Sequence, residues 1–138
     1  NQKKIDTKSQ YDYFFSKVKS STLKKKPNLV IFFYFYKKKF IGYGGYVNIN
    51  WIKKTAEISY LSISEVSNFK KKHKEVFSIF LRLVKNIAKK KLNLKTLYSE
   101  TYSIRKNHIR ILENSGFVFI KKKLNKKNSI SLIHKLIL

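Results

Sequence analysis

The hydrophobic and polar positions of this chain follow two different periods, which divide it into strand-like and helix-like segments. Eight successive apolar or aromatic residues form Leu29–Tyr36, a composition typical of a buried strand. Short polar turns separate this run from Phe40–Asn50 and Ala56–Ser64. Three strand-like runs with short connections predict an antiparallel meander.

Helical periodicity marks much of the remaining chain. Apolar residues recur every three or four positions in Asn68–Lys91, with lysines on the other face, which predicts the longest helix. A second helix is predicted at Ile104–Asn114, before Gly116, a residue that suits a left-handed helix cap. Ser9 is a candidate N-cap for a further helix at Gln10–Ser20. The other predicted strands are Leu94–Thr101, Phe117–Leu124 and Ser129–Leu138, the last two forming a hairpin.

The composition predicts a single globular domain spanning residues 1–138. A hydrophobic fraction of 43% with 15% aromatic residues argues against a disordered chain. Without cysteine the chain has no disulfide, thiolate nucleophile or cysteine-based zinc site, and the cytoplasm is the default expectation for its location. No metal site is expected either, because His73 and His134 lack neighbours at ligand spacing.

The net charge of +25 opens an alternative to catalysis, because 32 basic residues against 7 acidic ones would attract nucleic acid. Most of the basic residues are lysines, and they are spread over the whole chain. Only three are arginines, the side chain that most often reads base edges. This distribution favours a compositional bias, and a nucleic-acid-binding module remains the alternative.

Three stretches together resemble the GNAT superfamily of acetyl-CoA-dependent N-acetyltransferases. They are GYGGYVNINWIKKTAEISYLSI at Gly42–Ile63, the long helix that follows, and SETYSIRKNHIRILENSGF at Ser99–Phe117. The ending at Ile111–Phe117 is similar to the ribosomal-protein-type and amino-sugar-type branches. The resemblance implies an α/β (α+β) fold: a mixed, mostly antiparallel central sheet with helices on both faces. The family's first strand and helix would be missing or only partly retained, so an N-terminally truncated domain is expected.

The resemblance also implies a site for acetyl-CoA, between two parallel strands that splay apart, here Ala56–Ser64 and Leu94–Thr101. The family's glycine-rich phosphate loop is replaced here by Ser67–Lys74, which contains no glycine. Lysine charges at the helix start would then hold the phosphates, unless these lysines are only a solvated first turn. The candidate cofactor-binding residues are Tyr60, Leu61, Ser62, Ile63, Lys70, Lys71, Lys72, His73, Lys74, Arg105 and Asn107.

Catalysis would centre on Glu57, which corresponds to a glutamate that accepts the amine proton in many GNAT enzymes. Glu57 could instead be a strand residue paired with a nearby lysine, or a substrate contact. The family's tyrosine acid is replaced by Leu112-Glu113, so Tyr102 and His108 become the candidate acids, although His108 could simply be a packed or capping histidine.

Glycines would leave space for the acceptor, and Gly44, Gly45 and Asn48 are its expected contacts. The expected acceptor is a small primary amine, with a nucleotide-linked amino sugar as the candidate, and the expected assembly is a monomer or homodimer. A protein N-terminus or lysine is the alternative acceptor. A GNAT fold that has lost its CoA site is a further alternative.

Overall fold

The computed structural model describes residues 26–63 and 70–138. The helix expected at Gln10–Ser20, its cap Ser9 and most of the loop before the long helix lie outside the described residues. The described elements are β1 (Val30–Tyr36), β2 (Lys39–Asn50), β3 (Thr55–Ser62), α3 (Lys70–Lys90), β4 (Thr96–Tyr102), α4 (Lys106–Asn114), β5 (Val118–Leu124) and β6 (Ile130–Ile137). Their order and type confirm the elements predicted for this part of the chain.

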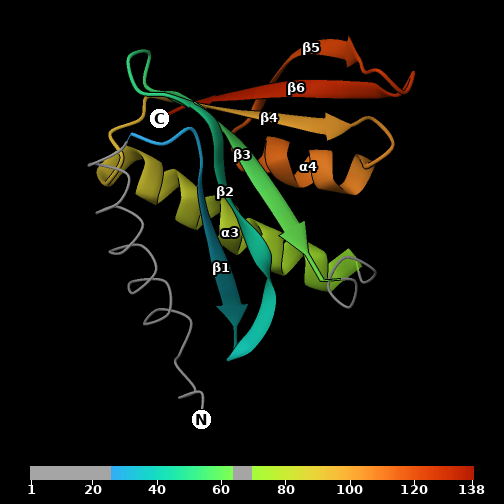
Figure 1. The fold of residues 1–138 in the computed structure, drawn as a ribbon. Coiled ribbons are helices and arrows are strands. Elements are labelled where there is room, and N and C mark those ends of the chain that lie inside the picture. The colour runs from blue at the N-terminus through green and yellow to red at the C-terminus, as the bar shows by residue number, and fades with distance from the viewer. Residues whose placement is uncertain (1–25, 64–69) are drawn as a thin grey trace.

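The strands form one six-stranded sheet in the order β1-β2-β3-β4-β6-β5 (Figure 1). Every neighbouring pair is antiparallel except β3 and β4, which are parallel. A parallel pair needs a crossover, and α3 provides it between these two strands. The fold is therefore the mixed, mostly antiparallel one that the sequence predicts.

Both described helices cover the same face of the sheet (Figure 1). The apolar stripe of α3 presents Phe77, Leu81 and Val84 to the core, all fully buried. Leu112 of α4 joins the same cluster, as does Leu97 of β4. Helices on both faces were expected from the sequence, and the helix expected at Gln10–Ser20 lies outside the described residues.

The parallel strands β3 and β4 pair only at their beginnings. Their register joins Thr55 to Thr96, Ala56 to Leu97 and Glu57 to Tyr98, and no later residues pair. Both strands nevertheless continue, β3 to Ser62 and β4 to Tyr102. The strands therefore splay apart beyond Glu57, and the facing backbone N–H and C=O groups are left without sheet partners.

Candidate functional site

A wedge-shaped cavity of about 260 Å³ fills the space where β3 and β4 separate. Its lining residues are Val47, Glu57, Ile58, Ser59, Tyr60, Leu61, Phe77, Ser99, Glu100, Thr101, Arg105 and His108. Tyr60 and Leu61 thus line the cavity as expected, whereas Ser62 and Ile63 do not. Unpaired strand backbone beside a cavity can bind an amide-containing chain, which is the chemistry of pantetheine.

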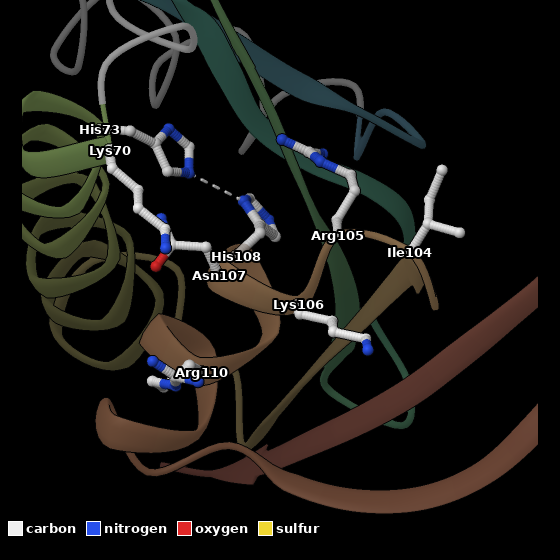
Figure 2. A pocket seen from close by; sticks show the side chains of 8 residues that line it. All are labelled: Lys70, His73, Ile104, Arg105, Lys106, Asn107, His108 and Arg110. Carbon is white, nitrogen blue, oxygen red and sulfur yellow. Dashed lines mark hydrogen bonds between the residues drawn. The ribbon is translucent and has the colours of Figure 1, made fainter.

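A larger basic cavity of about 610 Å³ lies where the N-terminal ends of α3 and α4 approach each other (Figure 2). The residues lining it are Lys70, His73, Ile104, Arg105, Lys106, Asn107, His108 and Arg110. No side chain caps the N-terminus of α4. Four cationic side chains and two helix N-termini favour an anion such as a phosphate. Arg105 and His108 line this basic pocket and the wedge alike, so the two cavities adjoin.

His73 and His108 form a buried pair between the two helices (Figure 2). Their Nε2 and Nδ1 atoms lie 3.3 Å apart, and the His108 ring stacks on Phe77 with a centroid separation of 3.9 Å. Burial is the main cause that lowers the pKa of His108 to about 3, with smaller contributions from Arg105 and His73. Burial and Arg105 also lower the pKa of His73. At neutral pH His108 is therefore uncharged, which does not support the proton-donor role expected for it.

Glu57 lies at the point where the strands separate. It is the last residue of β3 paired with β4, and its side chain is half-buried. The Asn48 amide donates a hydrogen bond to Glu57 Oε2 at 3.1 Å. Within residues 26–63 and 70–138 no lysine forms an ion pair with Glu57. The carboxylate thus stands at the base of the wedge with one side-chain donor.

Glu100 is a second carboxylate of the wedge, which the sequence reasoning missed. Its Oε2 lies 3.7 Å from Lys123 Nζ, and its side chain is 28% exposed. The register of the parallel pair places Glu100 near Glu57. Tyr98 lies opposite Glu57, and Glu100 is two residues further on the same face of β4. Only the pairing of β3 with β4 could supply that register.

The two expected glycine contacts have another role. A Cβ on Gly44 would lie 2.3 Å from Ser59 O, and one on Gly45 would lie 2.1 Å from Val30 O. Neither glycine lines the wedge. They allow the backbones of neighbouring strands to approach closely, and the acceptor contacts expected of them stay a prediction.

Other expected site residues lie apart from the two cavities. Tyr102, at the end of β4, is half-exposed and lines neither of them. Lys71 and Lys72 are exposed in the first turn of α3 and also line neither. Lys74 lines a separate groove of about 260 Å³ between α3 and α4. Of the lysines in this turn, only Lys70 reaches the basic pocket.

Across the described ranges, 26–63 and 70–138, no three potential ligands from His, Asp and Glu are grouped as a metal site would require. No helix in the same residues combines the length and apolar character needed to span a bilayer.

Comparisons with known proteins identify a family. The model of the acetyltransferase (GNAT) domain matches residues 1–131. A solved chimera of the spermidine N-acetyltransferase SpeG from Vibrio cholerae and hSSAT has a TM-score of 0.67 at 16% identity, covering 94% of this chain and 77% of that one. A second such chimera has a TM-score of 0.71 at 16% identity, covering 88% and 78%.

A further solved structure, spermidine/spermine N-acetyltransferase SpeG from Vibrio cholerae in complex with manganese ions, has a TM-score of 0.68 at 16% identity, covering 94% of this chain and 75% of that one. Likeness at this identity shows a shared fold. No curated protein matches the chain.

Proposed function

The chain belongs to the GNAT acetyltransferase family, and on that premise we propose that it transfers the acetyl group of acetyl-CoA to a primary amine inside the wedge. The observation that carries this proposal is the separation of β3 from β4 beyond Glu57. It opens a cavity with a carboxylate at its base and the basic pocket beside it. Acetyl-CoA needs both cavities: the wedge for its thioester and pantetheine, and the basic pocket for its phosphates.

Each end of the cosubstrate has a candidate binding surface. The unpaired backbone of β3 at Tyr60 and Leu61 suits the pantetheine amides, and we extend this surface to Ser62 and Ile63 at the strand end. The basic pocket suits the phosphates through Lys70 and the first turn of α4. The charges of these side chains replace the backbone cradle that a glycine-rich loop would have formed.

In the proposed reaction Glu57 accepts a proton from the ammonium form of the acceptor. The neutral amine nitrogen then bonds to the acetyl carbon, the carbon–sulfur bond breaks, and CoA leaves as its thiolate. The surplus proton of the acylated nitrogen passes through water to that thiolate, which gives the neutral amide and free CoA. His108 is neutral and stacked on Phe77, so its proposed role is to shape the wedge wall. Tyr102 would reach the thiolate only if the occupied wedge reoriented its side chain.

The first prediction tests the basic pocket. In a triple variant Lys70→Gln, Lys106→Gln, Arg110→Gln, the Kd for acetyl-CoA measured by calorimetry should rise at least about tenfold, because charge-assisted hydrogen bonds contribute ~1.5–3 kcal/mol each. In a control variant Lys89, Lys90 and Lys126 are changed to glutamine. It loses the same number of positive charges, but from residues that line neither cavity. Equal weakening in both variants would show that only the overall charge attracts the ligand.

The acceptor class follows from the charges in the wedge. Glu57 and Glu100 both line it, although the chain has only 7 acidic residues. Two carboxylates attract an acceptor with more than one ammonium group and disfavour a nucleotide sugar, whose phosphates are negative. We therefore infer a polyamine acceptor, the class to which spermidine belongs, after which the structurally similar SpeG proteins are named. Nucleotide-linked amino sugars and protein amines remain the alternatives.

The second prediction tests this acceptor class. In parallel assays of CoA release, spermidine should be acetylated more efficiently than a nucleotide-linked amino sugar or a peptide with a free N-terminus. Glu100→Gln should raise KM for spermidine about tenfold, equivalent to ~1.4 kcal/mol. A monoamine of similar length serves as the matched control, and its KM should stay unchanged. A preference for the nucleotide sugar would reverse the assignment.

The nonenzymatic alternatives make separate predictions. A nucleic-acid-binding module would bind DNA or RNA with an affinity that falls steeply with salt, and would not bind acetyl-CoA. A GNAT fold without a functional CoA site would bind neither. Calorimetric titrations of the unaltered chain with acetyl-CoA and, separately, with a nucleic acid therefore distinguish the three functions.

A further inference from the structure

Asn48 occupies an irregular position in β2. The pairing of β2 with β3 shifts between Val47, which lies opposite Glu57, and Asn50, which lies opposite Thr55, so β2 contains one extra residue. Asn48 has a φ of 51°. It is the one non-glycine residue with positive φ inside a strand of residues 26–63 and 70–138, where the others lie in turns or loops. This is a β-bulge with a left-handed residue.

The bulge changes the direction of the Asn48 side chain. In a regular strand Asn48 would point to the helix-covered face, as the fully buried Tyr46 does, because alternate side chains share a face. Here Ile49 takes the buried position, at 7% exposure, and Asn48 is exposed. Its amide instead reaches Glu57 Oε2 at 3.1 Å.

The hydrogen bond fixes one oxygen of the Glu57 carboxylate. Within the described part of the chain no other side-chain hydrogen bond or ion pair to Glu57 is found. Asn48 itself does not line the wedge. The left-handed conformation is unfavourable for most residues, but asparagine tolerates it. An asparagine at the bulge can therefore both adopt this backbone and donate the hydrogen bond to Glu57.

We propose that Asn48 is a positioning residue, which holds Glu57 Oε2 so that the other carboxylate oxygen faces the acceptor amine in the wedge. This inference rests on the proposed function. It replaces the direct contact with the acceptor that the sequence suggested for Asn48. A proton acceptor must lie within hydrogen-bond reach of the amine, and a misplaced one loses rate without loss of cosubstrate binding.

The test uses Asn48→Gly, because glycine adopts the left-handed backbone conformation readily and removes the side chain with its amide donor. We expect kcat to fall about tenfold, with an unchanged Kd for acetyl-CoA. The matched control is Asn128→Gly, which makes the same change at a left-handed residue, with φ of 58°, in the turn before β6. It should keep the activity of the unaltered chain.

A double variant separates positioning from general destabilisation. If Asn48 acts through Glu57, adding Asn48→Gly to Glu57→Gln should cause no further loss of kcat, whereas independent effects would multiply. Independent effects, or full kcat in Asn48→Gly alone, would overturn the positioning role and leave the proposed function intact.

A measurement that needs no turnover tests the hydrogen bond even if the chain has no acetyltransferase activity. The side-chain amide resonances of Asn48 should shift in the NMR spectrum of Glu57→Ala, because the acceptor oxygen is lost. Unshifted resonances would overturn the contact itself. If the unaltered chain acetylates no amine while the resonances do shift, the proposed function fails, the positioning of a catalytic base fails with it, and the hydrogen bond remains as a structural contact.

Discussion

Glu57→Gln is expected to lower kcat/KM for the amine by about 10²–10⁴-fold, the usual contribution of a positioned general base. Glutamine has the same shape and still offers Asn48 an oxygen to accept its hydrogen bond. It cannot accept the ammonium proton at neutral pH, and the protonated amine cannot attack the thioester. The loss should appear in kcat/KM for the amine, measured by CoA thiol release, while acetyl-CoA binding is retained.

The pH dependence of the Glu57→Gln variant provides a second readout. Its activity should recover in part as the pH approaches the pKa of the free amine, because solvent then supplies the neutral nucleophile. Glu75→Gln is the matched control: it makes the same substitution on α3, where Glu75 accepts a hydrogen bond from the Tyr36 hydroxyl and lines neither cavity. Unchanged turnover in Glu57→Gln would remove Glu57 from the mechanism.

Acidification is expected to destabilise the fold through His73 and His108. Burial lowers the pKa of both side chains in the folded chain, to about 3 for His108, whereas an unfolded histidine has a pKa near ~6.5. Below that pH the unfolded chain binds protons that the folded chain does not. The free energy of unfolding should therefore be fully retained above pH ~6.5 and fall by ~1.4 kcal/mol per pH unit for His108 as the pH drops toward its folded value.

Urea unfolding between pH 7.5 and 4.5 would measure this slope. In His108→Phe an aromatic ring still stacks on Phe77, but the titrating group is gone, so the dependence on pH should weaken by about one proton. Carboxylates also contribute to acid unfolding, but they are present in both proteins. The difference between the two slopes therefore reports His108. An identical slope in the two proteins would show that His108 is already accessible to protons in the folded chain.

The sequence predicted the elements well where hydrophobic periodicity is strong. The eight-residue run at Leu29–Tyr36 became β1, and the stripe in Asn68–Lys91 became α3. The burial of His73 was harder to foresee. It lies one turn before Phe77 in the stripe, yet a histidine surrounded by lysines on both sides suggests a solvated turn.

The site was predictable only in part. Glu57 could be placed on a strand of the expected wedge, but Glu100 could not be added to it, because a parallel register joins residues about 40 positions apart that no local pattern connects. The close strand approach at Gly44 could not be foreseen for the same reason: its neighbour across the sheet, Ser59 O, is what excludes a side chain there.

The sequence by itself thus determined which segments are strands and helices, because local propensity and periodicity depend on neighbouring residues. Its resemblance to the GNAT superfamily, and not periodicity, implied the single parallel strand pair and the carboxylate at Glu57. The tertiary structure alone decided where β3 and β4 part, that Arg105 and His108 line both cavities, and that a bulge points Asn48 toward Glu57. These features depend on strand register and on helix ends that meet in space, and both arise only when distant segments pack together.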